Sequence, residues 1–128
     1  MSPKITVAVN GALGRMGSTV LSAAAAELGV TPVGGADIAA SSDSVTIFGT
    51  SMSVPLAPSL TELFAISKPD VVVDFTNGEA AKESILTCID AGVRVVSGST
   101  GLSPEDMEVI RKRSSSTGVG VISASNFA

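Results

Sequence analysis

The sequence predicts an α/β fold in which a doubly wound parallel sheet forms a single domain. Three observations lead to this fold class. The chain has 128 residues, which is the usual size of one domain. Apolar residues make up 45% of it and aromatic residues only 3%, as expected where small aliphatic side chains fill buried parallel strands. Short apolar runs alternate with segments of helical periodicity, and this alternation is typical of right-handed βαβ units.

Short apolar runs mark the expected strands. They lie at residues 5–9, 30–36, 71–75, 93–96 and 119–122. A further short strand is expected at 53–56, at the edge of the sheet, within a Ser-rich stretch that covers residues 39–58. Each run is bounded by turn residues, and most are separated by enough residues for a helix, as a parallel sheet requires.

Helical spacing and capping sequences mark the expected helices. In the first helix, apolar residues recur at Met16, Val20, Leu21, Ala24 and Leu28. Gly29 is the expected C-cap of this helix. Three later helices are expected to begin at sequences that match a capping box, at 59–62, 76–79 and 103–106. The basic residues 111–113 are interpreted as the solvated C-terminal end of the last helix.

Composition argues against several classes of function. The formal net charge is −4, whereas a general nucleic-acid-binding protein needs a basic surface. The apolar run at 5–9 is too short for a signal peptide or a membrane span. The chain contains no His and one Cys, so it cannot form a Ser-His-Asp triad or an internal disulfide, and no metal site is expected. We therefore expect a cytoplasmic protein that binds neither nucleic acid nor a membrane, with Cys88 packed in the core beside Ile85 and Ile89.

A glycine-rich turn directly follows the first expected strand. Its sequence is Gly11-Ala12-Leu13-Gly14-Arg15-Met16-Gly17, a variant of the dinucleotide-binding fingerprint. In such a turn the backbone amides can approach a pyrophosphate, and the N-terminus of the following helix adds a partial positive charge. Glycines also form tight turns for purely structural reasons, but the position after the first strand favours a nucleotide site.

Asp37 lies twenty residues beyond Gly17, at the expected end of the second strand. A carboxylate at this place can accept hydrogen bonds from the adenosine ribose, so the turn and Asp37 together predict a Rossmann-type domain. The alternative is an aspartate in a solvated turn or a helix cap. The carboxylate would also repel a 2′-phosphate, and residues 38–40 contain no Arg or Lys, although Arg15 could pair with a phosphate. The expected cofactor is NADH or NADPH, with NADH favoured.

Polar residues follow three later strands, at 74–76, 98–101 and 125–127. Because the carboxyl ends of parallel strands share one edge, these segments are expected to lie together where ligands bind. Each has a structural alternative. Thr76 could cap a helix, Gly98 and Gly101 could form a turn, and Phe127 could fill the core.

The ordered motifs G-x-x-G-R-M-G, V-D-F-T, G-[ST]-T-G and N-F resemble the bacterial 4-hydroxy-tetrahydrodipicolinate reductase family, also called dihydrodipicolinate reductases. The resemblance extends from Ile5 to Ala128. It assigns residues to parts of the cofactor. The pyrophosphate is assigned to Gly11, Ala12, Leu13, Gly14, Arg15 and Met16, and the adenosine ribose to Asp37. Phe75 and Thr76 are expected to line the cleft, and the nicotinamide is assigned to Gly98, Ser99 and Thr100, with Thr100 also near the substrate. The segment that is expected to close over the nicotinamide and form a hinge consists of Ala124, Ser125, Asn126 and Phe127.

The sequence departs from the family pattern in three ways. Ser99 stands where the family usually has Thr, and Ser125 replaces a common Pro or Ala. A second domain, which in the family carries a His-His pair, a Lys, a Gly-Thr segment and the tetramer contacts, cannot be placed on this sequence. The resemblance therefore implies that residues 1–128 are the dinucleotide-binding domain, ending at the interdomain hinge and without a catalytic residue of its own.

The implied reaction is hydride transfer to a small cyclic dicarboxylate in diaminopimelate and lysine biosynthesis. We expect the isolated chain to bind the cofactor without turnover and without forming the family's homotetramer. Two alternatives stay open: a free-standing, non-catalytic nucleotide-binding module, and the first domain of a related amino-acid dehydrogenase. The GRMG and G-[ST]-T-G motifs favour the reductase over the dehydrogenase.

Overall fold

The computed structural model describes residues 4–99 and 101–123. The strands of the sheet are β1 (Ile5–Asn10), β2 (Val30–Ala36), β3 (Ser44–Thr46), β4 (Ser53–Ala57), β5 (Val71–Asp74), β6 (Arg94–Ser97) and β7 (Val121–Ser123). The helices are α1 (Arg15–Ala26), α2 (Leu60–Ile66), α3 (Gly78–Asp90) and α4 (Pro104–Thr117). Among these described residues, no helix is long and apolar enough to cross a membrane.

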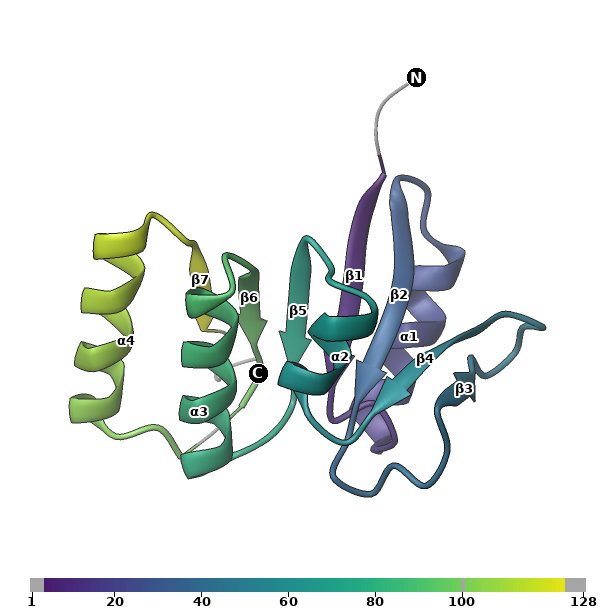
Figure 1. Ribbon diagram of the computed structural model, residues 1–128, viewed down its shortest axis with the longest axis horizontal. Helices are drawn as coiled ribbons and strands as arrows, with labels where there is room; N and C mark the ends of the chain where they lie inside the picture. Colours follow the sequence, from purple (N-terminus) through teal and green to yellow (C-terminus); the bar gives the residue numbers. More distant parts are fainter. Residues whose placement is uncertain (1–3, 100, 124–128) are drawn as a thin grey trace.

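The strand order is β3-β4-β2-β1-β5-β6-β7. All neighbouring strands are parallel except β3 and β4, which are antiparallel. Figure 1 shows α1 on one face of the sheet, against β1 and β2, while α2 and α3 cover the opposite face and α4 packs beside α3. The predicted α/β fold with a doubly wound, mainly parallel sheet is therefore confirmed.

The chain reverses its direction of winding between β1 and β5. From β1 it builds outward through β2 and β4, then returns to pair β5 with the other side of β1. In an open sheet of this kind the loops at such a switch point diverge beyond the carboxyl ends of the strands and leave a crevice. The fold therefore places the end of β1 and the end of β5 on the two sides of a natural ligand site.

Two groups of buried side chains, one on each face, hold the layers together. Leu21 of α1 packs with Val9 and Leu56 on one face. On the other face, Leu63 of α2 and Ile85 of α3 pack with a cluster that includes Val72. Burying each such aliphatic side chain contributes about 1.5–3 kcal/mol.

Cys88 lies in the second cluster with Ile85 and Ile89, as predicted. Burial raises the pKa of its thiol to about 12, and the charge of Asp74 adds to this effect. The thiol is therefore protonated at neutral pH and packs as a small apolar side chain.

The expected strand at 53–56 exists as β4, but its predicted place at the edge was wrong. It pairs with β2 on one side and with β3 on the other. The edge strand on this side of the sheet is β3, and no strand was expected there from the sequence. A turn between β3 and β4 brings the chain back, with Ile47 N–H donating to the Met52 carbonyl at 2.8 Å. A three-residue strand in a Ser-rich stretch has too few residues to show a period.

The first helix is shorter than its apolar pattern suggested. It ends at Ala26 with Glu27 as the C-cap, so the prediction of Gly29 as C-cap was wrong. Leu28 is 94% exposed and belongs to the turn that leads into β2. In that turn Gly29 has a positive φ, and its carbonyl accepts from Ile5 N–H at 2.9 Å. The helical spacing of apolar residues thus continues in the sequence to Leu28, although the helix itself ends at Ala26.

The predicted caps differ in outcome. Ser59 accepts from Glu62 N–H, and Ser103 forms the full reciprocal capping box with Asp106. The capping box predicted at 76–79 was wrong, because Asn77 is the N-cap of α3 and makes no side-chain cap. The Thr76 hydroxyl donates instead to the buried Asp74 carboxylate, at 2.9 and 3.1 Å from its two oxygens.

The basic residues 111–113 do not end the last helix, because α4 continues to Thr117. Arg111 pairs with Glu108, and Arg113 lies 2.7 Å from Asp90 of α3. The predicted position at the helix end was therefore wrong.

Candidate functional site

The glycine-rich turn connects β1 to α1 at the carboxyl edge of the sheet. Gly11 N–H and Ala12 N–H both donate to the Ala36 carbonyl, at 2.8 and 3.1 Å, which fixes the turn against the end of β2. A Cβ on Gly17 would lie only 2.0 Å from the Gly11 carbonyl oxygen, so the helix can approach the turn this closely only with glycine there. The turn is therefore folded tightly back on the first turn of α1.

The N-terminus of α1 has no side-chain cap. Its N-cap is Gly14, and its first turn contains no acidic residue. The partial positive charge of a helix N-terminus is therefore not neutralised by the helix's own side chains. The N-terminus of α3 is also without a side-chain cap, whereas α2 and α4 are both capped by serine.

A cavity of about 420 Å³ lies beside these two uncapped N-termini. Its lining comes from the turn and α1, from the segment after β5 and from the segment after β6. The lining residues are Gly11, Gly14, Arg15, Met16, Gly17, Phe75, Thr76, Asn77, Gly98 and Ser99. Eight of the residues predicted for the site are among them, so the structure brings together segments that lie far apart in the sequence.

Phe75 and Gly98 form one wall of this cavity. A Cβ on Gly98 would lie 2.7 Å from Cε1 of the Phe75 ring. One edge of the ring therefore lies close to the main chain of the segment after β6, and a side chain at position 98 would push the ring out of place. This packing fixes the width of the cavity at that end.

Ala12 and Leu13 were also predicted for the site. The Ala12 side chain is buried in the core cluster under α1. Leu13 has an exposed side chain, and its backbone N–H points to Asp37.

Asp37 directly follows β2 and links the glycine turn to the next loop. One carboxylate oxygen accepts from Leu13 N–H at 2.9 Å, and the other accepts from Ala39 N–H at 2.9 Å. The carboxylate is thus oriented by a local turn, as the structural alternative predicted, and also tied to the glycine turn. Each oxygen can accept more than one hydrogen bond, so the half-buried carboxylate is still able to accept from a ligand hydroxyl.

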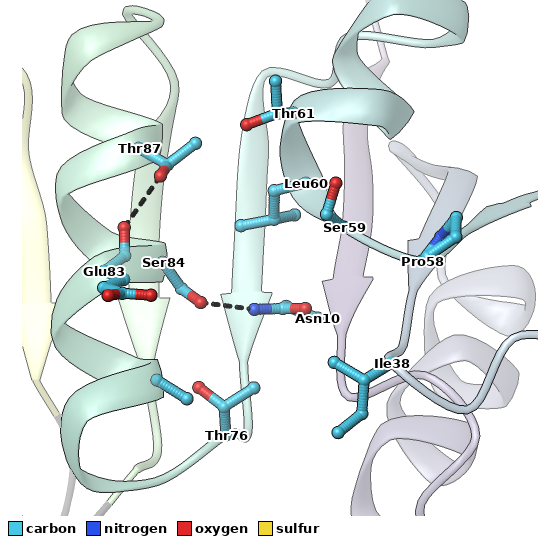
Figure 2. Close-up of a pocket in the computed structure, with 11 residues that line it drawn as sticks. Asn10, Ile38, Pro58, Ser59, Leu60, Thr61, Thr76, Glu83, Ser84 and Thr87 are labelled. Atoms are coloured by element: carbon cyan, nitrogen blue, oxygen red, sulfur yellow. Dashed lines mark hydrogen bonds between the residues drawn. The ribbon is translucent and has the colours of Figure 1, made fainter.

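A second cavity, of about 280 Å³, lies between α2 and α3 at the same edge of the sheet (Figure 2). Ile38 and Thr76 lie on opposite sides of one end of it, and Asn10 lies at its floor with its amide 2.7 Å from the Ser84 hydroxyl. The Ile38 side chain is 96% exposed. Thr76 lines both cavities, so the two are neighbours along the carboxyl edge.

Asp74, which the sequence placed at the ligand edge with residues 75 and 76 but without a role of its own, is fully buried. Its carboxylate accepts from the Asn10 amide at 2.9 Å, the Thr76 hydroxyl at 2.9 Å and the Ser99 hydroxyl at 2.7 Å, with the Ser97 hydroxyl at 3.4 Å. The sequence signal was an aspartate that closes a run of three valines. An acid at the end of a buried strand must find its partners among neighbouring strands.

Thr100 and the segment Ala124, Ser125, Asn126 and Phe127, also predicted for the site, lie outside the described residues. Within residues 4–99 and 101–123, no group of three or more His, Cys, Asp or Glu side chains is placed to hold a metal ion.

Comparisons with known proteins give a consistent result. The family model described as "Dihydrodipicolinate reductase, N-terminus" matches residues 5–127. The chain is 38% identical over 128 residues to the 4-hydroxy-tetrahydrodipicolinate reductase of Dehalococcoides mccartyi, covering 100% of this chain and 48% of that protein. It is 38% identical over 134 residues to the enzyme of the same name from Methanothermobacter thermautotrophicus, covering 97% of this chain and 48% of that protein.

Among solved structures, the fold is similar to the dipicolinate-bound dihydrodipicolinate reductase of Paenisporosarcina sp. TG-14. The TM-score is 0.83 and the identity 29%, over 98% of this chain and 48% of that chain. The chain thus spans about half the length of the relatives that it matches.

Proposed function

The chain belongs to the family of dihydrodipicolinate reductase N-terminal domains, and from this premise we propose that it binds a nicotinamide dinucleotide across the carboxyl edge of its sheet. The observation that carries the proposal is the 420 Å³ cavity at the switch point. There the glycine turn and the uncapped N-terminus of α1 face the segments after β5 and β6. Backbone amides and a helix N-terminus are the groups that bind a pyrophosphate.

Each part of the cofactor has a matching surface. The N–H groups of residues 11–14 already donate within the protein. The pyrophosphate therefore lies over the glycine turn of residues 11–16 at the first amides of α1, from Arg15 on, with Asp37 accepting from the adenosine ribose. The adenine enters the 280 Å³ cavity, between Ile38 and Thr76, where an apolar side chain suits a flat ring. The nicotinamide lies beside Phe75, Gly98 and Ser99. Thr100 and residues 124–127 complete this end in the proposal.

When bound, the nicotinamide supplies the hydride, and the protein supplies orientation and electrostatics. Phe75 packed on Gly98 gives the ring a rigid wall. Ser99 lines the same cavity. Because its hydroxyl and its N–H donate to Asp74 and Ser97, it can offer a carboxamide an oxygen acceptor. We propose that the hydride serves the reaction for which the relatives are named, the reduction step in diaminopimelate and lysine biosynthesis in the cytoplasm.

We further propose that the 128-residue chain does not turn over alone. The reaction needs a proton donor close to the substrate, held within about 3–3.5 Å of the hydride donor. The chain contains no His, and its Cys88 thiol is buried with a pKa of about 12. Its four lysines line neither of the two cavities at the carboxyl edge. The small cyclic dicarboxylate substrate and its proton donor would therefore be held by residues outside this sequence.

The cofactor preference follows from the loop after β2. Asp37 accepts from a free 2′-hydroxyl and repels a 2′-phosphate, and Ile38 offers no positive charge to the phosphate. A hydrogen bond to a charged group contributes roughly 1.5–3 kcal/mol, so NADH should bind about tenfold to a hundredfold more tightly than NADPH. The reverse order would indicate that Arg15, which lines the first cavity, binds the phosphate.

The test is isothermal calorimetry of the 128-residue chain with NADH and NADPH, in the parent and in two matched glycine variants. Gly11 and Gly29 both have a positive φ, of 87° and 83°, so replacement by alanine strains the two turns similarly. Only Gly11 borders the cavity. We expect Gly11→Ala to weaken NADH binding at least about tenfold and Gly29→Ala to leave it unchanged. Equal affinities in the two variants would contradict the proposed site.

A further inference from the structure

The Asp74 carboxylate is buried without a cationic partner. It is fully buried, and none of the ion pairs formed within residues 4–99 and 101–123 includes it. Its partners are the neutral amide and hydroxyl groups of Asn10, Thr76, Ser97 and Ser99. A buried carboxylate loses its hydration at a large cost, and a well-packed apolar side chain would often serve stability as well or better. Stability alone therefore does not account for an acid at this position.

The partners connect three neighbouring strands at one level. Asn10, Asp74 and Ser97 are register partners across β1, β5 and β6. The hydrogen bonds from Asn10 and Ser97 therefore run sideways across the last row of the sheet, and Asn10 also lines the smaller cavity. A carboxylate is suited to this position because it can accept several hydrogen bonds at once, and every neighbour there is a donor.

The segment after β6 is bound to Asp74 and Ser97 at several points, and the Ser99 hydroxyl is the group of this segment that reaches the Asp74 carboxylate. Gly98 N–H donates to the Asp74 carbonyl at 2.9 Å. The Ser99 hydroxyl donates to the Asp74 carboxylate at 2.7 Å, and Ser99 N–H donates to the Ser97 hydroxyl at 3.2 Å. The same segment forms the wall against Phe75. Asp74 thus holds the main chain through its backbone carbonyl and the Ser99 side chain through its carboxylate, at one end of the larger cavity.

We propose that Asp74 is a positioning residue that holds the nicotinamide end of the cleft in its binding shape. The inference rests on the proposed cofactor binding. Asp74 lines neither cavity and acts through Thr76 and Ser99, which do. The adenosine side of the site is built differently, because Asp37, Leu13 and Ala39 share their hydrogen bonds with one another and not with Asp74. Asn10 and Thr76 also connect Asp74 to the cavity proposed for the adenine, whereas the nicotinamide end has a further partner of the carboxylate in Ser99. The carboxylate should therefore affect the nicotinamide half of the dinucleotide more than the adenosine half.

The test compares two ligands, NADH and ADP-ribose, which lacks the nicotinamide. Asp74→Asn keeps the shape of the side chain but places an amide donor among groups that are themselves donors. We expect it to weaken NADH binding about tenfold, as the loss of a buried hydrogen bond predicts, and to leave ADP-ribose binding within about twofold. The fluorescence of bound NADH, which reports the surroundings of the nicotinamide, should shift toward that of free NADH.

Two further variants make the result decisive. Asp70→Asn is the same substitution just before the other end of β5, where the carboxylate accepts from Thr6 N–H, and it should change neither affinity. Ser97→Ala removes a buried hydroxyl of the network that lines neither cavity, so it provides a milder form of the same effect if Asp74→Asn does not fold. Ser97→Ala should weaken NADH binding and spare ADP-ribose.

Each outcome is informative. A selective loss of NADH binding supports the inference. Equal losses for NADH and ADP-ribose, or no loss for either, overturn it, because Asp74 would then only stabilise the sheet edge or do nothing for the ligand. If the unaltered chain binds neither ligand, the proposed function fails, and the inference fails with it.

Discussion

Asp70 directly precedes β5 and Asp74 is its last residue, and the two aspartates differ in their burial and in their hydrogen-bond partners. At the amino end of β5, Asp70 is exposed and forms reciprocal bonds with Thr6 of β1. Its carboxylate accepts from Thr6 N–H at 2.9 Å, and its own N–H donates to the Thr6 hydroxyl at 2.9 Å. At the carboxyl end, Asp74 is buried and binds side chains from three neighbouring segments.

The difference extends to the rest of the two edges. The bonds between Asp70 and Thr6 join two strands, and neither residue lines one of the two cavities. The bonds of Asp74 end on side chains, three of which, Asn10, Thr76 and Ser99, belong to residues that line the cavities. Likewise, the helix N-termini that border the larger cavity are left without side-chain caps, whereas Ser59 and Ser103 cap the other two. At the carboxyl edge, then, the backbone N–H groups at the helix N-termini beside the larger cavity are not bonded by side-chain caps. This is expected if a ligand completes them.

The largest effect is expected from adding a cap where the structure has none. Gly14 is the N-cap of α1 with φ −76°, and a Cβ there meets only the Gly11 carbonyl oxygen, at 3.4 Å. Gly14→Asp should cap α1 and raise the free energy of unfolding by a few tenths of a kcal/mol up to about 1. It should also weaken NADH binding tenfold or more, on the order expected when a carboxylate occupies a pyrophosphate site.

Urea denaturation and calorimetry on the same preparation measure both quantities. Gly14→Ala is the control, because it adds a Cβ without a cap. A Gly14→Asp variant that is more stable and still binds NADH as the parent does would show that the uncapped N-terminus is not part of the ligand site.

A smaller effect, and of the opposite kind, is expected where the cap already exists. Ser103→Ala removes the hydroxyl that accepts from Asp106 N–H at 3.0 Å. It should lower the free energy of unfolding by about 1 kcal/mol and leave NADH affinity unchanged, because Ser103 lines neither of the two cavities. Ser103→Asp, which can still cap the helix, should restore most of the stability. A loss of NADH affinity in Ser103→Ala would mean that the two kinds of helix terminus do not differ in function.

The smallest effect concerns the amino edge and acid pH. The hydrogen bond from Thr6 N–H holds the pKa of Asp70 below its ordinary value, as the bond from Ser103 N–H does for Asp106. A lowered pKa in the folded state means that the stabilisation is present above the unfolded pKa of about 3.9 and is lost as the pH falls below it. Because Asp70 is exposed, its share should be small.

Urea midpoints at pH 5 and pH 3 measure this dependence. Asp70→Asn should be slightly less stable than the parent at pH 5 and should lose less stability between the two values. Some dependence remains, since Asp106 and Glu108 also have lowered pKa values. An unchanged slope in Asp70→Asn would show that its bond to Thr6 does not stabilise the fold.

Local features of the fold could be predicted from the sequence, because spacing and residue type specify them. The strand Val30–Ala36 has the bounds that its apolar run gave, and Ser59 and Ser103 cap as their sequences predicted. Thr76 shows the limit of such rules. The sequence 76–79 has the spacing of a capping box, but the N-cap of α3 is Asn77, one residue later, and the Thr76 hydroxyl is directed to the buried Asp74 carboxylate.

In the candidate site, too, the contiguous features could be predicted from the sequence, and the features that depend on strand pairing could not. The glycine turn and Asp37 are contiguous signals that follow single strands. The Asp74 network depends on Asn10, Asp74 and Ser97 being register partners. Asn10 and Ser97 lie 64 and 23 residues from Asp74 in the chain, and the local sequence of a strand does not specify its register with such a distant strand. The pairing is fixed only when the whole sheet is assembled.

Gly17 and Gly14 have different prospects under mutation, although both belong to the same motif. A Cβ at position 17 would lie 2.0 Å from the Gly11 carbonyl oxygen, whereas at position 14 the nearest contact is 3.4 Å. No single replacement at 17 keeps this turn, so that position can change in a lineage only if the turn changes with it. Position 14 is sterically open to substitution. If it is held constant in descendants of this chain, selection on the bound ligand, and not packing, would be the reason.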